Sequence, residues 1–227
     1  MSSGEPRRAV ALVSGGMDSA VAAAWARDEG YRIVTLAVDY GQRHHVELEA
    51  AREISRWLDA HEHVVLAADL RTVGGSALTD AIDVPRGGGT VGIPVTYVPA
   101  RNTVLLALAL GLAEARGATA IVIGVNSVDY SGYPDCRPAF LDAFARVAEA
   151  GTKAGVEGRA PRILAPLIDL SKAGIVKMGT RLDVPFAQTI SCYDPRATGA
   201  ACGGCDACRL RRKGFSEAGV ADPTKYA

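Results

Sequence analysis

Aromatic residues are scarce in this 227-residue sequence, and neither sign of charge is in excess. Phenylalanine, tyrosine and tryptophan make up 6% of the residues, which is too few for a broad base-stacking surface. The 25 lysines and arginines balance 25 acidic residues, so the chain lacks the basic field typical of proteins that bind phosphate backbones. We therefore expect no nucleic-acid partner, and the 25 glycines favour the tight turns of an enzyme.

Long apolar runs are also missing. The most apolar stretch, residues 103–112, has about half the length needed to cross a bilayer and predicts a buried helix. Arg7 and Arg8 precede an apolar run near the N-terminus, but Ser14 and Asp18 interrupt it before a signal-peptide core is complete. We therefore expect a cytoplasmic protein without membrane association. In that reducing compartment, cysteines are expected to be metal ligands or catalytic thiols.

Strand-like and helix-like segments alternate along most of the chain. Strands are predicted at 9–13, 32–38, 63–67, 118–124 and 162–168, and helices at 19–29, 45–60, 102–116 and 138–153. Residues 69–95 are rich in Gly, Thr, Asp and Pro, and they predict a long loop. The alternation predicts an α/β fold with a Rossmann-like, doubly wound parallel sheet, which we expect to span residues 1–190.

A glycine-containing loop, from Val13 to Ser19, joins the first predicted strand to the first predicted helix. Its two glycines permit a tight turn that points N–H groups at an anion, and the helix N-terminus adds positive potential. Asp18 is suited to hold Mg²⁺ beside a nucleotide phosphate. The alternative is an ordinary strand-to-helix connection capped by Asp18 or Ser19. The expected ATP-binding residues are Val13, Ser14, Gly15, Gly16, Met17, Asp18, Ser19, Ala20 and Val21.

A second glycine motif, Gly-x-Gly-x-x-Gly at residues 87–92, has the spacing of a dinucleotide-binding loop. It lies between Pro85 and Pro94, so it neither leaves a predicted strand nor opens a predicted helix. We interpret it as part of the long loop.

Four of the five cysteines cluster near the C-terminal end, at Cys192, Cys202, Cys205 and Cys208. Two adjoining Cys-x-x-Cys steps and a remote fourth thiolate can complete a tetrahedral sulfur shell around a structural Zn²⁺, although the spacing also suits an iron–sulfur cluster. Residues 191–215 have no hydrophobic period, so we expect 191–227 to form a small zinc-binding lobe of the same globule. The basic residues that follow are Arg209, Arg211, Arg212 and Lys213. We interpret them as a solvated segment and not as a phosphate-contacting patch.

The loop at 14–19 resembles the signature of the PP-loop ATP pyrophosphatases, which cleave ATP between the α and β phosphates. The rest of the chain resembles the QueC family, the 7-cyano-7-deazaguanine synthases. The residues that carry this resemblance are 14–19, 39–44, 98–102, 129–137, Ser171 with Lys172, and 191–193 with the three later cysteines. The chain departs from the family pattern at Ala20, Val21 and Ala100, which affects one or two phosphate-contacting hydroxyls at most.

The resemblance implies a reaction, its substrates and some of its residues. ATP would adenylate 7-carboxy-7-deazaguanine, ammonia would displace AMP to leave an amide, and a second adenylation would allow elimination to the nitrile. Mg²⁺ would accompany ATP, Asp18, Arg101 and Lys172 would be catalytic, and the protein would be a homodimer. The alternative is another PP-loop enzyme that adenylates a tRNA base for thiolation.

The base of the substrate has a guanine-like N–H edge. Asp129 or Asp135 could accept hydrogen bonds from this edge, and Tyr130 or Tyr133 is available for stacking. The alternative is a turn in which Asp135 caps the following helix and Tyr133 merely packs. The full expected substrate-binding set is Arg101, Asn102, Asp129, Tyr130, Tyr133, Asp135 and Arg137. Cys136 is expected either in the core or on the pocket wall, whereas His44 and His45 are interpreted as solvated residues at a helix start.

Overall fold

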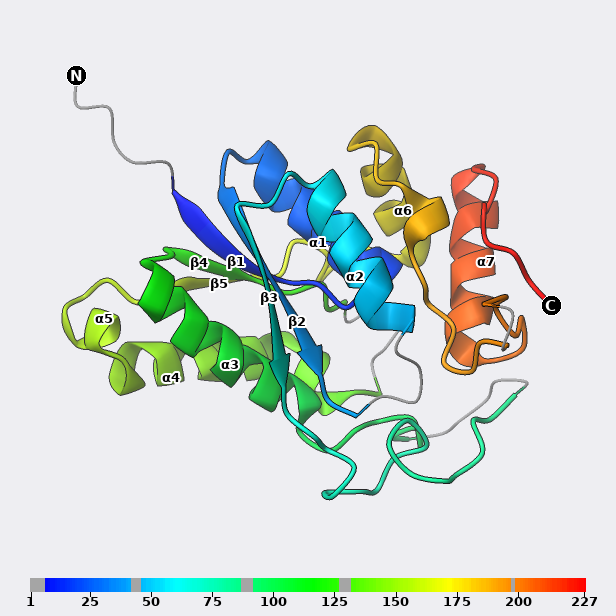
Figure 1. The fold of residues 1–227 in the computed structure, drawn as a ribbon, viewed down its shortest axis with the longest axis horizontal. Helices are drawn as coiled ribbons and strands as arrows, with labels where there is room; N and C mark the ends of the chain where they lie inside the picture. Colours follow the sequence, from blue (N-terminus) through cyan, green and yellow to red (C-terminus); the bar gives the residue numbers. More distant parts are fainter. Residues whose placement is uncertain (1–6, 42–45, 87–91, 127–131, 197–198) are drawn as a thin grey trace.

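A five-stranded parallel sheet forms the centre of the molecule in the computed structural model, which describes residues 7–41, 46–86, 92–126, 132–196 and 199–227 (Figure 1). The strands are β1 (Arg8–Leu12), β2 (Arg32–Asp39), β3 (Glu62–Ala67), β4 (Ala120–Val122) and β5 (Arg162–Leu164). Their order is β3-β2-β1-β4-β5, and each neighbouring pair is parallel. The chain winds outward to β3 and returns to the other side of β1, so the direction of winding reverses between β1 and β4.

Helices cover both faces of the sheet. They are α1 (Met17–Asp28), α2 (Val46–Trp57), α3 (Arg101–Arg116), α4 (Pro138–Gly151), α5 (Lys153–Val156), α6 (Lys172–Arg181) and α7 (Asp206–Ala218), with short 3₁₀ turns η1 (Pro134–Cys136) and η2 (Phe186–Gln188). Figure 1 shows α1, α2, α6 and α7 on one side of the sheet and α3 and α4 on the other. The predicted doubly wound α/β fold is thus confirmed.

Two hydrophobic clusters, one on each face, explain why the inner strands are apolar throughout. Ala9 and Ala11 of β1 pack with the α1 side, whereas Val10 and Leu12, which point the opposite way, pack with the α3 side. A strand covered on both faces shows no alternation of polar and apolar residues, and β1 is therefore apolar at every position from Ala9 to Leu12. No helix among the described residues is long and apolar enough to cross a membrane.

The C-terminal segment differs from its predicted irregular form, because α7 is a regular helix that packs against α6. At Gly214 a Cβ atom would lie 2.4 Å from Cγ of Lys172, so the two helices meet at van der Waals contact of backbone and side chain. Neither α6 nor α7 was expected from periodicity. The buried face of α7 is Ala207, Cys208, Arg211, Gly214 and Phe215. Its spacing is helical, but small and charged residues occupy most of it.

The long connection between β3 and α3 contains no helix or strand in its described residues, 68–86 and 92–100, as predicted. It lies against the cysteine segment, since Arg86 Nη2 forms an ion pair with Asp194 Oδ2 at 3.1 Å. Most of the glycine motif, residues 87–91, falls outside the described residues, as do His44 and His45.

Candidate active site

The loop after β1 reaches the carboxyl edge of the sheet beside the β1–β4 reversal. The backbone N–H of Ser14 donates to Ser19 Oγ at 3.1 Å, and Ser19 Oγ donates to the Gly16 carbonyl at 3.0 Å. Gly15 has φ +80°, and a Cβ atom there would lie 2.3 Å from the Glu47 carbonyl oxygen. Only glycine therefore allows this turn to rest on the first turn of α2.

The first turn of α1 is open to an anion. Its N-cap is Gly16, which has no side chain to accept the first N–H groups, so neither Asp18 nor Ser19 acts as the N-cap. Gly124, after β4, brings the chain so close that a Cβ atom would lie 2.8 Å from both Cα and N of Ser19. The N-terminus of α1 is thus held tightly against the carboxyl edge of the sheet.

Asp18 and Lys172 form a largely buried ion pair next to this loop. Lys172 Nζ lies 2.7 Å from Asp18 Oδ2, and the two side chains are 6% and 24% exposed. The other carboxylate oxygen, Asp18 Oδ1, is buried and accepts no hydrogen bond from the described residues. An orphaned carboxylate oxygen is unfavourable in a folded protein and is a preferred ligand for Mg²⁺, so the donor set fits that ion.

A cavity of about 270 Å³ opens beside the loop. Its wall includes six of the expected ATP-binding residues, namely Val13, Ser14, Gly16, Met17, Asp18 and Ser19. Gly15 forms the turn, and Ala20 and Val21 belong to α1, where they lie in the core with no exposed surface. Lys172 of α6 also lines the cavity, as do Tyr193 and Arg211 of the C-terminal segment.

Three of the expected substrate-binding residues, Arg101, Asn102 and Tyr133, also line the cavity. The Arg101 guanidinium donates to the Tyr40 hydroxyl at 3.4 Å. The Tyr133 hydroxyl shares a hydrogen bond with the Thr96 hydroxyl at 2.7 Å. Arg101 and Asn102 begin α3, so the start of this helix forms part of the cavity wall.

Asp135 was expected either to contact the substrate base or to cap the following helix, and the structure contradicts the second alternative. Its Oδ2 accepts a hydrogen bond from the backbone N–H of Asn102 at 3.0 Å, so it caps the start of α3 and not the α4 helix that follows it. Asn102 Nδ2 in turn donates to the Asp135 carbonyl at 3.0 Å. Arg137 is exposed at the N-cap of α4. Asp129 and Tyr130 lie outside the described residues, and their roles stay predictions.

Cys136 satisfies both expectations, since it is 6% exposed and lines the cavity. Burial and the nearby Asp135 charge raise the pKa of its thiol to about 11. Asn102 Nδ2 donates to its sulfur at 3.3 Å. The side chain is a neutral thiol at physiological pH and not a nucleophilic thiolate.

Glu47 and Tyr40 are cavity residues that the sequence analysis did not single out. Burial raises the pKa of Glu47 to about 7, and the positive charge of Arg101 opposes that rise. Burial also raises the pKa of Tyr40, again against the effect of Arg101. The available signal was position, because Tyr40 lies within the 39–44 motif that carries the family resemblance and Glu47 follows it by three residues.

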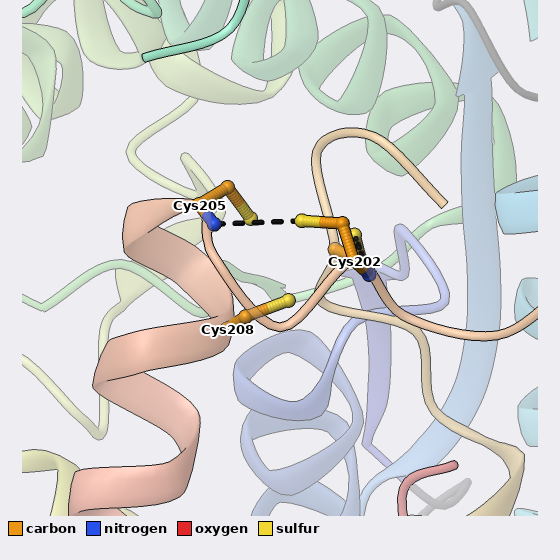
Figure 2. Close-up of side chains that lie close together, drawn as sticks. Cys202, Cys205 and Cys208 are labelled. Carbon is orange, nitrogen blue, oxygen red and sulfur yellow. Dashed lines mark hydrogen bonds between the residues drawn. The ribbon is translucent and has the colours of Figure 1, made fainter. Parts of the chain in front are cut away.

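The four clustered cysteines place their sulfur atoms within 4.8 Å of one another. Figure 2 shows the side chains of Cys202, Cys205 and Cys208 converging, with the backbone N–H of Cys205 donating to Cys202 Sγ at 3.4 Å. Backbone N–H groups of Asp194 and Cys202 donate to Cys192 Sγ at 3.3 and 3.2 Å. Hydrogen bonds from the thiols of Cys192 and Cys208 lower the pKa of Cys205. Such a group can hold a metal ion.

Arg211 is 2% exposed, which corrects its interpretation as part of a solvated basic segment. Its Nη1 donates to Thr189 Oγ1 at 2.7 Å, and its Nη2 donates to the Phe186 carbonyl at 2.9 Å. Its Nε lies 3.1 Å from Asp222 Oδ1. The guanidinium is buried because these partners satisfy its donors and balance its charge, and it ties α7 to the chain that leads into the cysteine cluster.

The parallel sheet, the loop at its reversal and the uncapped helix start define an α/β nucleotide-binding fold of the PP-loop type. An NMN synthetase from Francisella tularensis has this fold, with a TM-score of 0.50 and 19% identity over 95% of this chain and 74% of that chain. A 4-thiouridine synthetase, solved with RNA and bound ATP, matches with a TM-score of 0.51 and 20% identity over 92% of this chain and 53% of that one. At these identities the likeness concerns the fold alone.

The sequence model of the family described as "Queuosine biosynthesis protein QueC" matches residues 8–219. The 7-cyano-7-deazaguanine synthase of Anaeromyxobacter dehalogenans (strain 2CP-C) is 62% identical over 98% of this chain and 97% of its own length. That of Stutzerimonas stutzeri (strain A1501) is 60% identical, with 97% and 98% covered. The chain belongs to the QueC family, as the sequence resemblance predicted, and this finding favours the synthase over the tRNA-thiolation alternative.

Proposed function

We propose that this protein is a 7-cyano-7-deazaguanine synthase that converts 7-carboxy-7-deazaguanine and ammonia to the nitrile at the expense of ATP, releasing AMP and pyrophosphate. The observation that carries the proposal is the family membership of nearly the whole chain, joined to a cavity beside an uncapped helix start. The enzyme is a ligase that forms C–N bonds. We further propose that it works in the cytoplasm as a homodimer and binds no nucleic acid.

ATP binds with its phosphates at the 13–19 loop, where the first-turn N–H groups of α1 and the hydroxyls of Ser14 and Ser19 act as donors. Asp18 Oδ1 holds Mg²⁺, which supplies charge neutralisation on the phosphate oxygens. Lys172 keeps Asp18 oriented through its 2.7 Å contact and adds positive charge where pyrophosphate departs. Arg101 stabilises the carboxylate of the acid substrate before it attacks the α-phosphorus.

The deazapurine lies against the start of α3, where Asn102 and Tyr133 contact it together with Arg101. Asp135 supports this wall by fixing the Asn102 backbone. Asp129, Tyr130 and Arg137 complete the proposed substrate-binding set. The four cysteines bind Zn²⁺ as a structural ion, because four thiolates leave no open coordination position for chemistry. Residues 191–227 then act as a metal-bound lobe of the globule formed with residues 1–190.

The test is a mass-spectrometric assay of the purified protein with ATP, Mg²⁺, ammonium and 7-carboxy-7-deazaguanine. The expected products are the nitrile, AMP and pyrophosphate, with the amide as an intermediate. Omission of the acid substrate should abolish AMP formation. If AMP never depends on the acid substrate, the proposed function is wrong, whereas accumulation of amide alone limits the chain to the first activation.

A further inference from the structure

The cavity wall contains a carboxylate, Glu47, that the proposed reaction has not yet used. It belongs to the first turn of α2. The backbone of this turn packs closely on the 13–19 loop, since a Cβ atom at Gly15 would lie 2.3 Å from the Glu47 carbonyl oxygen. Its side chain lines the same cavity as Asp18 and Lys172. The Glu47 backbone therefore lies directly beside the loop at which the nucleotide phosphates are proposed to bind.

The two carboxylates on the described part of the cavity wall differ in their surroundings. Asp18 is paired with Lys172, whose Nζ lies 2.7 Å from Asp18 Oδ2. Glu47 faces the positive charge of Arg101 and the hydroxyl of Tyr40, and burial outweighs Arg101 in raising its pKa to about 7. Arg211 is the remaining cation on this wall, and its donors are taken by Thr189 and Phe186. Glu47 can therefore gain and lose a proton near neutral pH.

The proposed reaction needs protons to be removed from the nitrogen. At neutral pH the nitrogen source is mainly ammonium, which has no lone pair and cannot attack an acyl adenylate. Every proton that ammonium brings must leave the nitrogen before a nitrile exists. A carboxylate that exchanges protons near the working pH suits repeated transfers better than one that is held in an ion pair with a lysine.

We propose that Glu47 binds ammonium and is the catalytic base that removes protons from its nitrogen, an inference that rests on the proposed function. The carboxylate first takes a proton from ammonium and the freed lone pair forms the C–N bond, while the bond from the acyl carbon to the AMP oxygen breaks and AMP leaves with the electron pair. A further N–H proton passes through Glu47 to solvent and leaves the amide.

The second stage uses the same nitrogen and the same base. The amide oxygen attacks the α-phosphorus of another ATP, pyrophosphate departs, and one N–H proton is lost to give an adenylated imidate. Glu47 then takes the last N–H proton as the C–O bond to AMP breaks, and the electron pair of the N–H bond completes the nitrile. No oxidant or reductant is involved.

The test compares Glu47→Gln with Glu49→Gln, a control on the same helix whose side chain is 60% exposed. Glutamine keeps the size of Glu47 and removes its basicity. With ammonium at neutral pH we expect Glu47→Gln to lower the rate of amide formation by about 100-fold or more. Its rate should then rise by about tenfold per pH unit as free ammonia replaces ammonium. Glu49→Gln should match the unchanged protein at each pH.

Hydroxylamine separates the base from the adenylation chemistry, because it is uncharged at neutral pH and needs no deprotonation before it attacks. Acid-dependent AMP and hydroxamate should form in Glu47→Gln at a rate comparable to that of the unchanged protein. Loss of both the ammonium and the hydroxylamine reactions would overturn the base assignment, as would an unaltered ammonium rate at neutral pH. If the unchanged protein makes no acid-dependent AMP with either ammonium or hydroxylamine, the proposed function itself fails.

Discussion

Replacing Gly15 with alanine tests whether the conformation of the 13–19 loop depends on its close contact with α2. Two costs arise in the folded state. The φ of +80° disfavours any L side chain, by about 1 kcal/mol for alanine. The added Cβ would lie 2.3 Å from the Glu47 carbonyl oxygen and 2.9 Å from the Ala50 Cβ, so α2 must move away from the loop. Overpacking of this kind costs about 1–3 kcal/mol.

Gly30 provides a matched control, because it has φ +81° and a Cβ atom there meets nothing within 4 Å. Gly30→Ala should show only the conformational cost, about 1 kcal/mol, and should keep normal ATP affinity. Gly15→Ala should lose about 2–4 kcal/mol of unfolding free energy, and its ATP affinity should fall because the N–H donors are displaced.

Urea unfolding followed by tryptophan fluorescence gives the two unfolding free energies, and ATP titration by calorimetry gives the affinities. Trp25 and Trp57 are suitable reporters, since both pack against the hydrophobic cluster on the α1 face. Equal losses of stability in the two variants, together with unchanged ATP affinity in Gly15→Ala, would refute the claim that close contact with α2 shapes the loop.

The remaining predictions concern the ion pair, the metal cluster and a half-buried histidine. Lys172→Ala should lower kcat by about 100-fold, while Lys177→Ala, exposed on the same helix, should not; equal rates would remove Lys172 from the mechanism. Metal analysis should find stoichiometric zinc, and Cys208→Ser should release it and lower the Tm; full metal retention would contradict the predicted ligand set. Burial and two nearby arginines lower the pKa of His63 from 6.5. Because the folded state resists its protonation, unfolding free energy should fall as pH drops from about 6.5 towards the lower folded value, and His63→Gln should reduce that slope in urea titrations at several pH values.

Hydrophobic periodicity predicted the inner strands, which bury apolar side chains. It did not predict α7, whose buried face includes a charged side chain and several small ones. β1 is a continuous apolar run from Ala9, and β2 is apolar from Ile33 to Val38 except at Thr35, because helices cover both of their faces, so the sequence signal was direct. In α7, Arg211 occupies a core position that a charged residue rarely takes. It is buried only because Thr189, Phe186 and Asp222 supply acceptors. That compensation depends on tertiary contacts and could not be read from the spacing.

Local sequence patterns also could not predict that a residue far away along the chain caps a helix. Asp135 precedes a helix and has the residue type of a cap, so the expectation that it caps α4 followed from neighbouring residues alone. The structure pairs it instead with Asn102 of α3, 33 positions away. Glu47 was missed for a related reason. A glutamate in the first turn of an amphipathic helix is ordinarily solvated, and only the cavity distinguishes it from Glu49.

The cysteine segment belongs to the site as well as to the metal cluster. Cys192 lies between Ser191 and Tyr193, and both of these neighbours line the cavity. Arg211 Nη1 lies 3.3 Å from Ser191 Oγ, which fixes the segment from the side of α7. A metal held by Cys192 would therefore restrain the same stretch of backbone that places Ser191 and Tyr193 on the wall. A structural ion without any chemistry of its own can in this way determine the shape of the substrate cavity.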